Sequence, residues 1–201
     1  MKIDFIFDLA SPNAYFCHKV LPKFEEEHNV SVDYFPCLLG GVFKSTGNQP
    51  PWMAFAEIPN KMSYMMKEMQ RFISRHALND FKMNSHFPLN TLQLMRMLAG
   101  ITEDDLKITV IDILFKGIWE KDLKLDDVEI LKSYLLAEGL DADALINLSE
   151  DPSSKNKLLE NTTKSVDFGV FGIPTFKIGD EIFFGKEALL EIPKYIEISN
   201  F

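Results

Sequence analysis

A strand that gives way almost at once to a helix is the feature that most constrains the fold of this chain. Ile3, Phe5 and Phe7 alternate with other residues at the period of two that is typical of a β-strand. Ser11 is a favoured residue for capping a helix N-terminus, and Pro12 suits the first helical position. The sequence therefore predicts a helix that begins directly beyond the end of a strand.

The predicted helix buries one face and leads into a second strand. The apolar residues that share this face are Ala14, Cys17, Leu21 and Phe24. Pro22 is expected to kink or split the helix, because a proline lacks the backbone N–H that the helix needs. Residues 30–36 then predict a short strand, and residues 38–51 are rich in turn-forming residues. Strand, helix and strand in this order favour a right-handed parallel unit.

The middle of the chain, residues 59–168, is predicted to be almost entirely helical. It opens with methionines from Met62 to Met69 at spacings of three and four. Thr102 and Asp105 resemble a capping box, and Gly139 a helix stop. Further helices are expected over residues 90–98, 103–121, 126–138 and 152–167. Such a segment is too long for a loop, which indicates a helical insertion.

The last forty or so residues return to sheet. Residues 175–178 and 181–184 predict two strands joined by Gly179 and Asp180, a two-residue turn with glycine first. A closing helix is expected over residues 186–195. The complete order is that of an α/β protein with a thioredoxin-like sheet (βαβ…ββα) and a large helical insertion. We expect residues 1–58 and 169–201 to form a discontinuous thioredoxin-like domain, and residues 59–168 an insertion domain.

Charge and composition exclude several function classes. The formal net charge is −9, whereas a nucleic-acid-binding protein needs a basic face. No apolar run reaches the roughly 20 residues of a membrane span, and no secretion signal is present, so we expect a cytoplasmic protein without a membrane partner. Cys17 and Cys37 lack the CxxC spacing of a redox or metal site, and the four histidines form no ligand pair, so no metal is expected.

Ser11 is the first candidate for chemistry. It lies at the amide end of a helix, where free N–H groups and the helix dipole favour a negative charge such as a thiolate. The alternative is that the Ser-Pro pair only starts the helix. Asp8 is close enough in sequence to influence Ser11, although a carboxylate at a helix start is more often structural.

The second candidate is the segment FGVFGIPTF, residues 168–176. Pro174 follows a branched residue and precedes a strand, which suits a cis peptide bond and turns the backbone of Ile173 outward. In a thioredoxin-like sheet this loop faces the N-terminus of the first helix, where the Ile173 backbone could pair with the backbone of a peptide-like ligand. The alternative is a proline that merely begins a strand.

The chain resembles the 2-hydroxychromene-2-carboxylate isomerases, which are related to the kappa class glutathione transferases and to bacterial disulfide oxidoreductases. The resemblance is carried nearly end to end by FDLASPNAY, LLGGVFKSTGNQPPW, FPLNTLQLMR, and FGVFGIPTF followed by FFGKEAL. The second and third segments are the most specific, because the fold alone does not require them. In the disulfide oxidoreductases two cysteines occupy the positions of Ser11 and Ala14, so that motif cannot exchange disulfides here.

The resemblance implies glutathione as the cofactor, with Ser11 as the catalytic residue that hydrogen-bonds its sulfur. The other implied glutathione-binding residues are Asn48, Lys61, Ile173, Pro174, Gly185, Lys186 and Glu187. Three positions depart from the family pattern. Glu187 replaces an aspartate, Ala188 an arginine, and Asn13 an aromatic residue, which bears on glutathione affinity and on substrate shape.

The activity implied is isomerisation of a small aromatic substrate: the thiolate adds, a bond made temporarily single rotates, and the thiol leaves. The resemblance also implies a homodimer. The helix dipole contributes about 0.3 to 1 kcal/mol, less than one pKa unit, so the Ser11 hydrogen bond must contribute most of the thiol activation. The alternatives are a kappa-like glutathione transferase, a non-catalytic thioredoxin-fold binding module and a residual disulfide exchanger.

The methionines of residues 62–69 have two interpretations. Methionine is flexible and polarisable, so this stripe could line an adaptable pocket for an aromatic substrate. The competing interpretation is an ordinary helix face that packs into the core.

Overall fold

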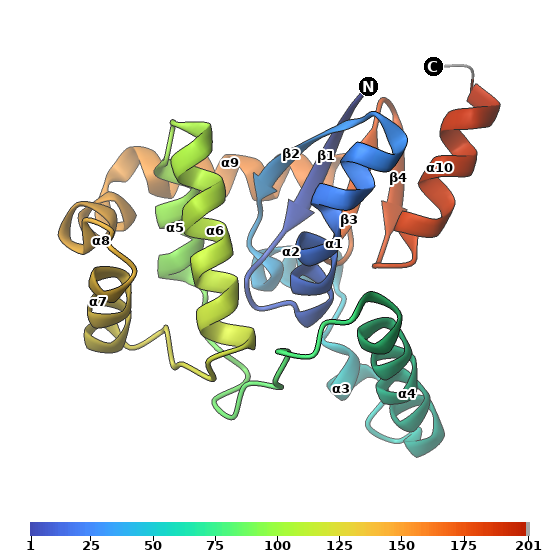
Figure 1. Ribbon diagram of the computed structural model, residues 1–201, viewed down its shortest axis with the longest axis horizontal. Coiled ribbons are helices and arrows are strands. Elements are labelled where there is room, and N and C mark those ends of the chain that lie inside the picture. The colour runs from blue at the N-terminus through green and yellow to red at the C-terminus, as the bar shows by residue number, and fades with distance from the viewer. Residues whose placement is uncertain (200–201) are drawn as a thin grey trace.

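Four strands form one mixed sheet, and the computed structural model describes residues 1–199 around it (Figure 1). The strands are β1 Lys2–Phe7, β2 Ser31–Pro36, β3 Thr175–Ile178 and β4 Glu181–Phe184. They lie in the order β2-β1-β3-β4, with β1 parallel to β2 and antiparallel to β3, and β3 antiparallel to β4. The predicted α/β class, with a βαβ start and a ββα end, is confirmed.

The apolar alternation of β1 determines how the sheet packs. Ile3, Phe5 and Phe7 are fully buried. The Phe5 ring stacks on Phe176 of β3 with centroids 5.1 Å apart, and it meets Tyr34 of β2 edge-on at 5.2 Å. These three strands therefore share one aromatic layer, which packs against the helix that follows β1.

Helix α1, Pro12–His28, begins and ends as the sequence predicts. The Ser11 side chain caps its first turn, and Asn29 ends it in the left-handed conformation with φ of 50°. The predicted split at Pro22 is wrong, because the helix runs unbroken through that residue. Pro22 costs the helix one backbone hydrogen bond, and the burial of neighbouring Leu21 and Phe24 offsets this loss.

The predicted helical insertion is confirmed. The remaining helices are α2 Leu39–Thr46, α3 Pro51–Ala54, α4 Pro59–His76, α5 Leu92–Gly100, α6 Asp104–Trp119, α7 Val128–Ala137, α8 Ala142–Glu150, α9 Pro152–Asp167 and α10 Ala188–Ser199. The structure adds α2, α3 and α8 to the helices expected from sequence. Helix α6 is capped by Glu103 and not by Thr102. None of the described helices has both the length and the apolar character needed to cross a membrane.

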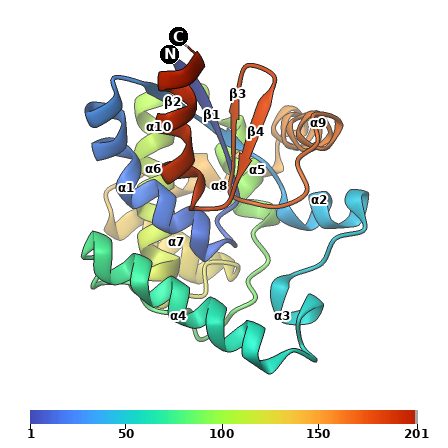
Figure 2. The ribbon, with the colours of Figure 1, turned by 90° about the vertical axis from the view of Figure 1, so that its right-hand side faces the viewer.

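Helices cover both faces of the sheet (Figure 2). Helices α1 and α10 lie on one face, and α2 and α9 on the other. Helix α9 is joined to the end of β2 and to the residues that follow it by polar contacts. The Asn161 amide donates to the Pro36 carbonyl at 3.1 Å, and the Leu38 N–H donates to the Thr162 hydroxyl at 3.0 Å. Helix α4 lies beneath the N-terminal end of α1, and this arrangement positions the site described next.

Candidate functional site

Ser11 and Ile173, 162 positions apart, meet at the N-terminus of α1. The Ser11 hydroxyl donates a hydrogen bond to the Ile173 carbonyl at 3.2 Å and accepts one from the Ala14 N–H at 3.2 Å. Ser11 is only 5% exposed. The structure therefore brings together the two segments that the sequence analysis singled out, and the Ser11 hydroxyl has a single proton committed to one carbonyl.

Two backbone N–H groups flank this hydroxyl without a protein partner. The Ile173–Pro174 peptide bond is cis, as the sequence predicts. Among the hydrogen bonds of residues 1–199, none is donated by the Ile173 N–H or by the Asn13 N–H in the first turn of α1. The Asn13 N–H is one of those that a helix start leaves without an intrahelical acceptor, and the Ile173 N–H belongs to a buried residue, so both can donate to an acceptor that comes from a ligand. Ile173 itself is 7% exposed.

A buried carboxylate holds the turn that precedes Ser11. Asp8, 1% exposed, accepts hydrogen bonds from the Ala10 N–H at 2.9 Å, the Leu39 N–H at 2.7 Å and the Thr91 hydroxyl at 2.6 Å. Burial raises the pKa of Asp8, and the three hydrogen bonds oppose that rise. Asp8 thus fastens the starts of α2 and α5 to the turn of Ser11.

A second pair of contacts supports the same turn from α5 and α6. The Trp119 indole N–H donates to the Leu9 carbonyl at 3.0 Å. The Leu9 N–H points to the Met95 sulfur at 3.5 Å. Both Trp119 and Met95 are fully buried, so the backbone immediately before Ser11 is fixed by core side chains.

Lys186 lies in a cluster with two carboxylates beside the N-terminus of α10. Its ammonium group pairs with Glu68 of α4 and with Glu187, the latter at 3.0 Å, and its side chain is 3% exposed. Burial raises the pKa of Glu68 above its ordinary value. Burial also acts on Glu187, but hydrogen bonds with Glu68 and Lys186 outweigh it and lower the pKa of Glu187. Two carboxylates for one ammonium leave this cluster with spare negative charge.

Gly185 and Asn48 brace the loop of Pro174. The Gly185 N–H, in a residue with φ of 85°, donates to the Pro174 carbonyl at 2.8 Å. The Asn48 amide donates to the Phe171 carbonyl at 2.8 Å. Lys61 lies apart from these residues, with its ammonium 5.2 Å from the centre of the Phe55 ring.

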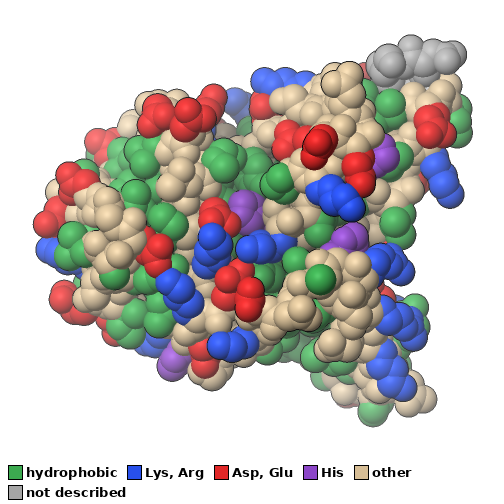
Figure 3. Space-filling model, in the orientation of Figure 1, with side chains coloured by type: hydrophobic (Ala, Val, Ile, Leu, Met, Phe, Trp, Pro, Cys, Tyr) green, Lys and Arg blue, Asp and Glu red, His purple; other side chains and the backbone are tan. Residues whose placement is uncertain are grey.

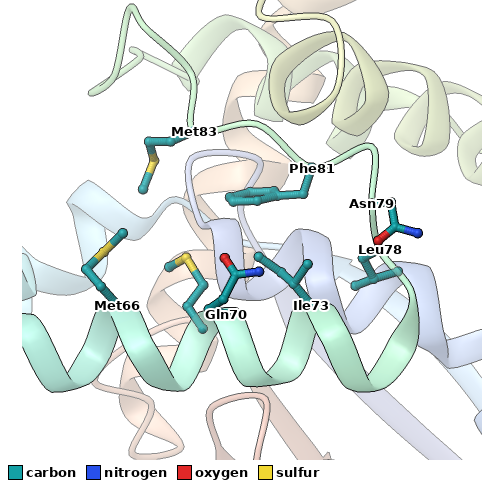
Figure 4. A pocket seen from close by; sticks show the side chains of 8 residues that line it. Met66, Gln70, Ile73, Leu78, Asn79, Phe81 and Met83 are labelled. Atoms are coloured by element: carbon teal, nitrogen blue, oxygen red, sulfur yellow. The ribbon is translucent and has the colours of Figure 1, made fainter.

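The methionines of α4 are not buried in the core, although Met69 packs against it. Among the residues of this helix, Phe72 and Ile73 are buried, whereas Met66 is 51% exposed. Met66 and Met69 line a cavity of about 330 Å³ between α4 and the segment that follows it (Figure 4). The sequence pattern does not reveal the contributions of Phe81 and Met83, because these residues lie on a loop without periodicity.

The two cysteines lie in environments that suppress thiolate chemistry. Cys17 and Cys37 are free and buried. Burial raises the pKa of Cys37 to about 11, and it raises that of Cys17 further. Within residues 1–199, no group of three or more His, Cys, Asp or Glu side chains is arranged to hold a metal ion.

The chain matches a known protein family over nearly its whole length. The family model of the DSBA-like thioredoxin domain matches residues 2–197. Glutathione S-transferase kappa 1 of Rattus norvegicus is 28% identical over 183 residues, which cover 86% of this chain and 79% of the relative. The 2-hydroxychromene-2-carboxylate isomerase of Sphingobium xenophagum is 24% identical over 195 residues, which cover 96% of this chain and 97% of the relative.

Solved structures support the same fold. A structure of 2-hydroxychromene-2-carboxylate isomerase superposes with a TM-score of 0.83 at 20% identity, covering 99% of this chain and 96% of the other. Pseudomonas aeruginosa DsbA superposes with a TM-score of 0.56 at 16% identity, covering 99% and 83%. The helical insertion and the sheet are therefore shared as one arrangement.

Proposed function

Because the chain belongs to the DSBA-like thioredoxin domain family, we propose that it is a glutathione-dependent isomerase of a small aromatic compound. The observation that carries the proposal is the geometry at Ser11. The Ser11 hydroxyl and the Asn13 N–H, which has no partner among the described residues, both lie at the N-terminus of α1, and no cysteine stands at this turn. This donor set suits a bound sulfur anion.

The residues around Ser11 fit the remainder of glutathione. The unpaired N–H of Ile173 would meet the cysteinyl backbone of the tripeptide. The carboxylates of Glu68 and Glu187, with their spare negative charge, would hold the ammonium group of its γ-glutamyl end. Lys186 is already paired with both carboxylates, so its role in the proposal is to hold them in place. Asn48 acts through the Phe171 carbonyl, and Lys61 is exposed and available to a glycyl carboxylate.

When bound, glutathione would supply a thiolate nucleophile that can add to the conjugated substrate and leave again as a thiolate, which would permit rotation about a bond made temporarily single. Ser11 makes this possible by turning its proton from the Ile173 carbonyl toward the sulfur. The hydrogen bond that it gives up is neutral and is worth about 0.5–1.5 kcal/mol, whereas one to a charged partner is worth about 1.5–3 kcal/mol. The exchange therefore favours the thiolate by roughly one pKa unit.

The alternative function is that of a kappa-like glutathione transferase, which would use the same thiolate but release the glutathione conjugate as its product. Two observations favour the isomerase. The isomerase relative matches over nearly its whole length, and the segments LLGGVFKSTGNQPPW and SPNAY resemble the isomerases more closely. The identity to the rat transferase is slightly higher, at 28%, so the choice is one that product analysis must test.

The testing experiment is calorimetric titration with reduced glutathione, together with the ultraviolet absorbance of the bound thiolate. We expect Ser11→Ala to bind glutathione in the thiol form and to lose at least tenfold in turnover. Asp141→Ala is the matched control, since it removes a helix cap at α8 and leaves Ser11 intact. If Ser11→Ala turns over substrate as well as the parent does, the role proposed for Ser11 is overturned. If the parent chain itself binds glutathione but turns over neither substrate, the chain is a binding module. Product analysis with a chromene carboxylate and with a chloroarene separates isomerase from transferase.

The proposal has two further parts: a homodimer, which rests on the sequence resemblance, and a cytoplasmic location, which is the expectation from the sequence pattern. Light scattering coupled to size-exclusion chromatography measures the first, and cell fractionation measures the second. A monomer at micromolar concentration would remove the homodimer from the proposal and leave the chemistry at Ser11 unaffected.

A further inference from the structure

We propose that the outer face of α4 is an approach surface for glutathione, where a row of cations attracts the anionic ligand and raises the rate at which it reaches the Ser11 site. The inference rests on the proposed function for the identity of the ligand. It goes beyond that function because it assigns a kinetic role to Lys67, Arg71 and Arg75, side chains that the bound ligand need not touch.

The charge of the whole chain opposes the arrival of such a ligand. The sequence has 30 acidic and 21 basic residues, which leaves a net charge of −9. Glutathione carries two carboxylates and one ammonium group at neutral pH, so it has the same sign. The cluster of Lys186 with Glu68 and Glu187 adds a spare negative charge at the site itself. A ligand of like sign associates slowly unless a local field of opposite sign lies beside the site.

Helix α4 carries charge of the opposite sign. Its single carboxylate, Glu68, is paired with Lys186. Its exposed lysines and arginines, here called the α4 cation row, are Lys61, Lys67, Arg71 and Arg75. Within residues 1–199, none of the four forms an ion pair with a carboxylate. The charge of the row is therefore uncompensated by the protein.

The helical spacing places the row on the same side of α4 as Glu68. Lys61 and Arg75 lie two turns before and after Glu68, and Arg71 lies one turn after it. Lys67, Arg71 and Arg75 line one shallow surface depression and span about 12 Å of the helix axis. The Arg71 guanidinium lies 5.6 Å from the centre of the Tyr64 ring, which restrains it on this face.

Helix α4 lies against the elements that form the candidate site. The ring of Phe72, the neighbour of Arg71, is 5.7 Å from the ring of Phe16 in α1, and the Lys186 ammonium is 5.7 Å from the centre of the Phe72 ring. Figure 3 shows basic side chains exposed along α4, at the lower right of the molecule. A ligand drawn to this face therefore arrives beside the carboxylate cluster and the start of α1.

The test separates the association rate constant from the dissociation rate constant. Reduced glutathione is mixed with the full chain in a stopped-flow instrument, and the absorbance of the bound thiolate is followed. The variant combines Lys67→Gln, Arg71→Gln and Arg75→Gln. At an ionic strength of about 10 mM we expect its association rate constant to fall about threefold, with the dissociation rate constant changed by less than about twofold. At about 0.5 M salt the difference should disappear, because the charges are then screened.

A second triple variant is the matched control. It combines Lys155→Gln, Lys157→Gln and Lys164→Gln on α9, which lies on the face of the sheet opposite to α1. Both variants lose the same three positive charges, and the control should keep the parent association rate constant. If the α4 variant does not fold, Lys67→Gln with Arg75→Gln retains the Arg71 contact with Tyr64 and should slow association about twofold at low salt.

Three outcomes overturn the inference. They are an unchanged association rate constant in the folded α4 variant at low salt, an equal fall in the α9 variant, and a fall that persists at 0.5 M salt. The first removes the effect, the second assigns it to net charge alone, and the third to direct contact. Calorimetry of the parent chain tests the proposed function separately. Binding of glutathione with an unchanged association rate constant removes only this inference, whereas absence of binding removes both.

Discussion

The hydroxyl of Thr91 donates a 2.6 Å hydrogen bond to the buried carboxylate of Asp8, a residue 83 positions earlier in the chain. The same carboxylate accepts from the Leu39 N–H. Three segments that carry the family resemblance, FDLASPNAY, LLGGVFKSTGNQPPW and FPLNTLQLMR, thus converge on one side chain. The contacts that these three segments make with Asp8 hold the turn before Ser11 in place.

Thr91→Val should destabilise the fold through this contact. The valine keeps the shape but removes the donor from a buried carboxylate, so we expect a loss of about 1.5–3 kcal/mol in the free energy of unfolding. Urea denaturation at pH 7 measures it. Thr109→Val is the control, because its hydroxyl donates to the Asp105 carbonyl at an exposed site and its loss should stay under about 0.5 kcal/mol. Equal losses in the two variants would contradict the role given to Asp8.

Lys186→Met should destabilise the protein more at neutral than at acid pH. It leaves Glu68 and Glu187 facing each other without their common cation, at a cost of at least about 2 kcal/mol. At pH near 5 one carboxyl can take up a proton and donate to the other, so the loss should shrink. Lys132→Met, which breaks a surface pair with Asp143, should cost about 0–1 kcal/mol at either pH. A pH-independent loss for Lys186→Met would count against the carboxylate repulsion.

Glu187→Gln should weaken the binding of glutathione, and the loss should arise only from the interaction with the ammonium group of glutathione. The parent chain is expected to bind glutathione at least tenfold more tightly than the analogue that lacks the γ-glutamyl amino group. In Glu187→Gln this preference should fall to about threefold or less, because one carboxylate of the cluster is lost. Calorimetric titration gives the four dissociation constants. Glu181→Gln, exposed on β4, should keep the full preference, and an equal fall there would show a general electrostatic effect.

A buried histidine should make stability depend on pH. His18 is 6% exposed and contacts the Tyr34 hydroxyl at 2.7 Å and Asp112 at 3.2 Å. Burial lowers the pKa of His18, although Asp112 opposes this. A neutral imidazole still donates to Asp112, and this hydrogen bond, together with Lys116, holds the pKa of Asp112 well below its ordinary range.

The sign of the effect follows from proton uptake. The unfolded His18 takes up a proton near pH ~6.5, whereas the folded one stays neutral to lower pH, so the unfolded state binds more protons in that window. The free energy of unfolding should therefore fall as the pH drops below ~6.5, by at most about 1.36 kcal/mol per pH unit from this residue. His18→Gln should flatten the dependence between pH ~6.5 and the folded pKa of His18.

Neither cysteine should react while the chain is folded. Burial raises the pKa values of both Cys17 and Cys37, so little thiolate is present at pH 8. A chromogenic disulfide reagent should label both thiols only after unfolding in urea. Rapid labelling of the native chain, or an insulin-reduction activity that disappears when both residues become serine, would revive the disulfide-exchange alternative.

The elements around Ser11 were predictable because they depend on local chemistry. A Ser-Pro helix start, a proline before a strand, and a Gly179 turn each leave a short signature in the sequence. The sequence does not predict helix α2, because Gly40 and Gly41 are typical of turns and residues 38–51 are rich in such residues. In the structure, Gly41 has a packing role, since a Cβ there would lie 2.9 Å from the Thr162 side chain.

The contacts that assemble the site were less predictable. The ion pair of Lys186 with Glu68 links residues 118 positions apart, and no periodicity in the sequence predicts it. The same is true of Phe81 and Met83, which become pocket residues only because the loop folds back over α4. The division into residues 1–58 with 169–201, and 59–168, stays a prediction, and the contacts of Thr91 and Trp119 with the first turn cross that boundary.

Helix α4 presents Glu68 to the carboxylate cluster and Met66 to the cavity, two residues apart on one rigid rod. Because a helix moves as one unit, any displacement of α4 that follows a change in the carboxylate cluster also displaces Met66 and, with it, the wall of the cavity.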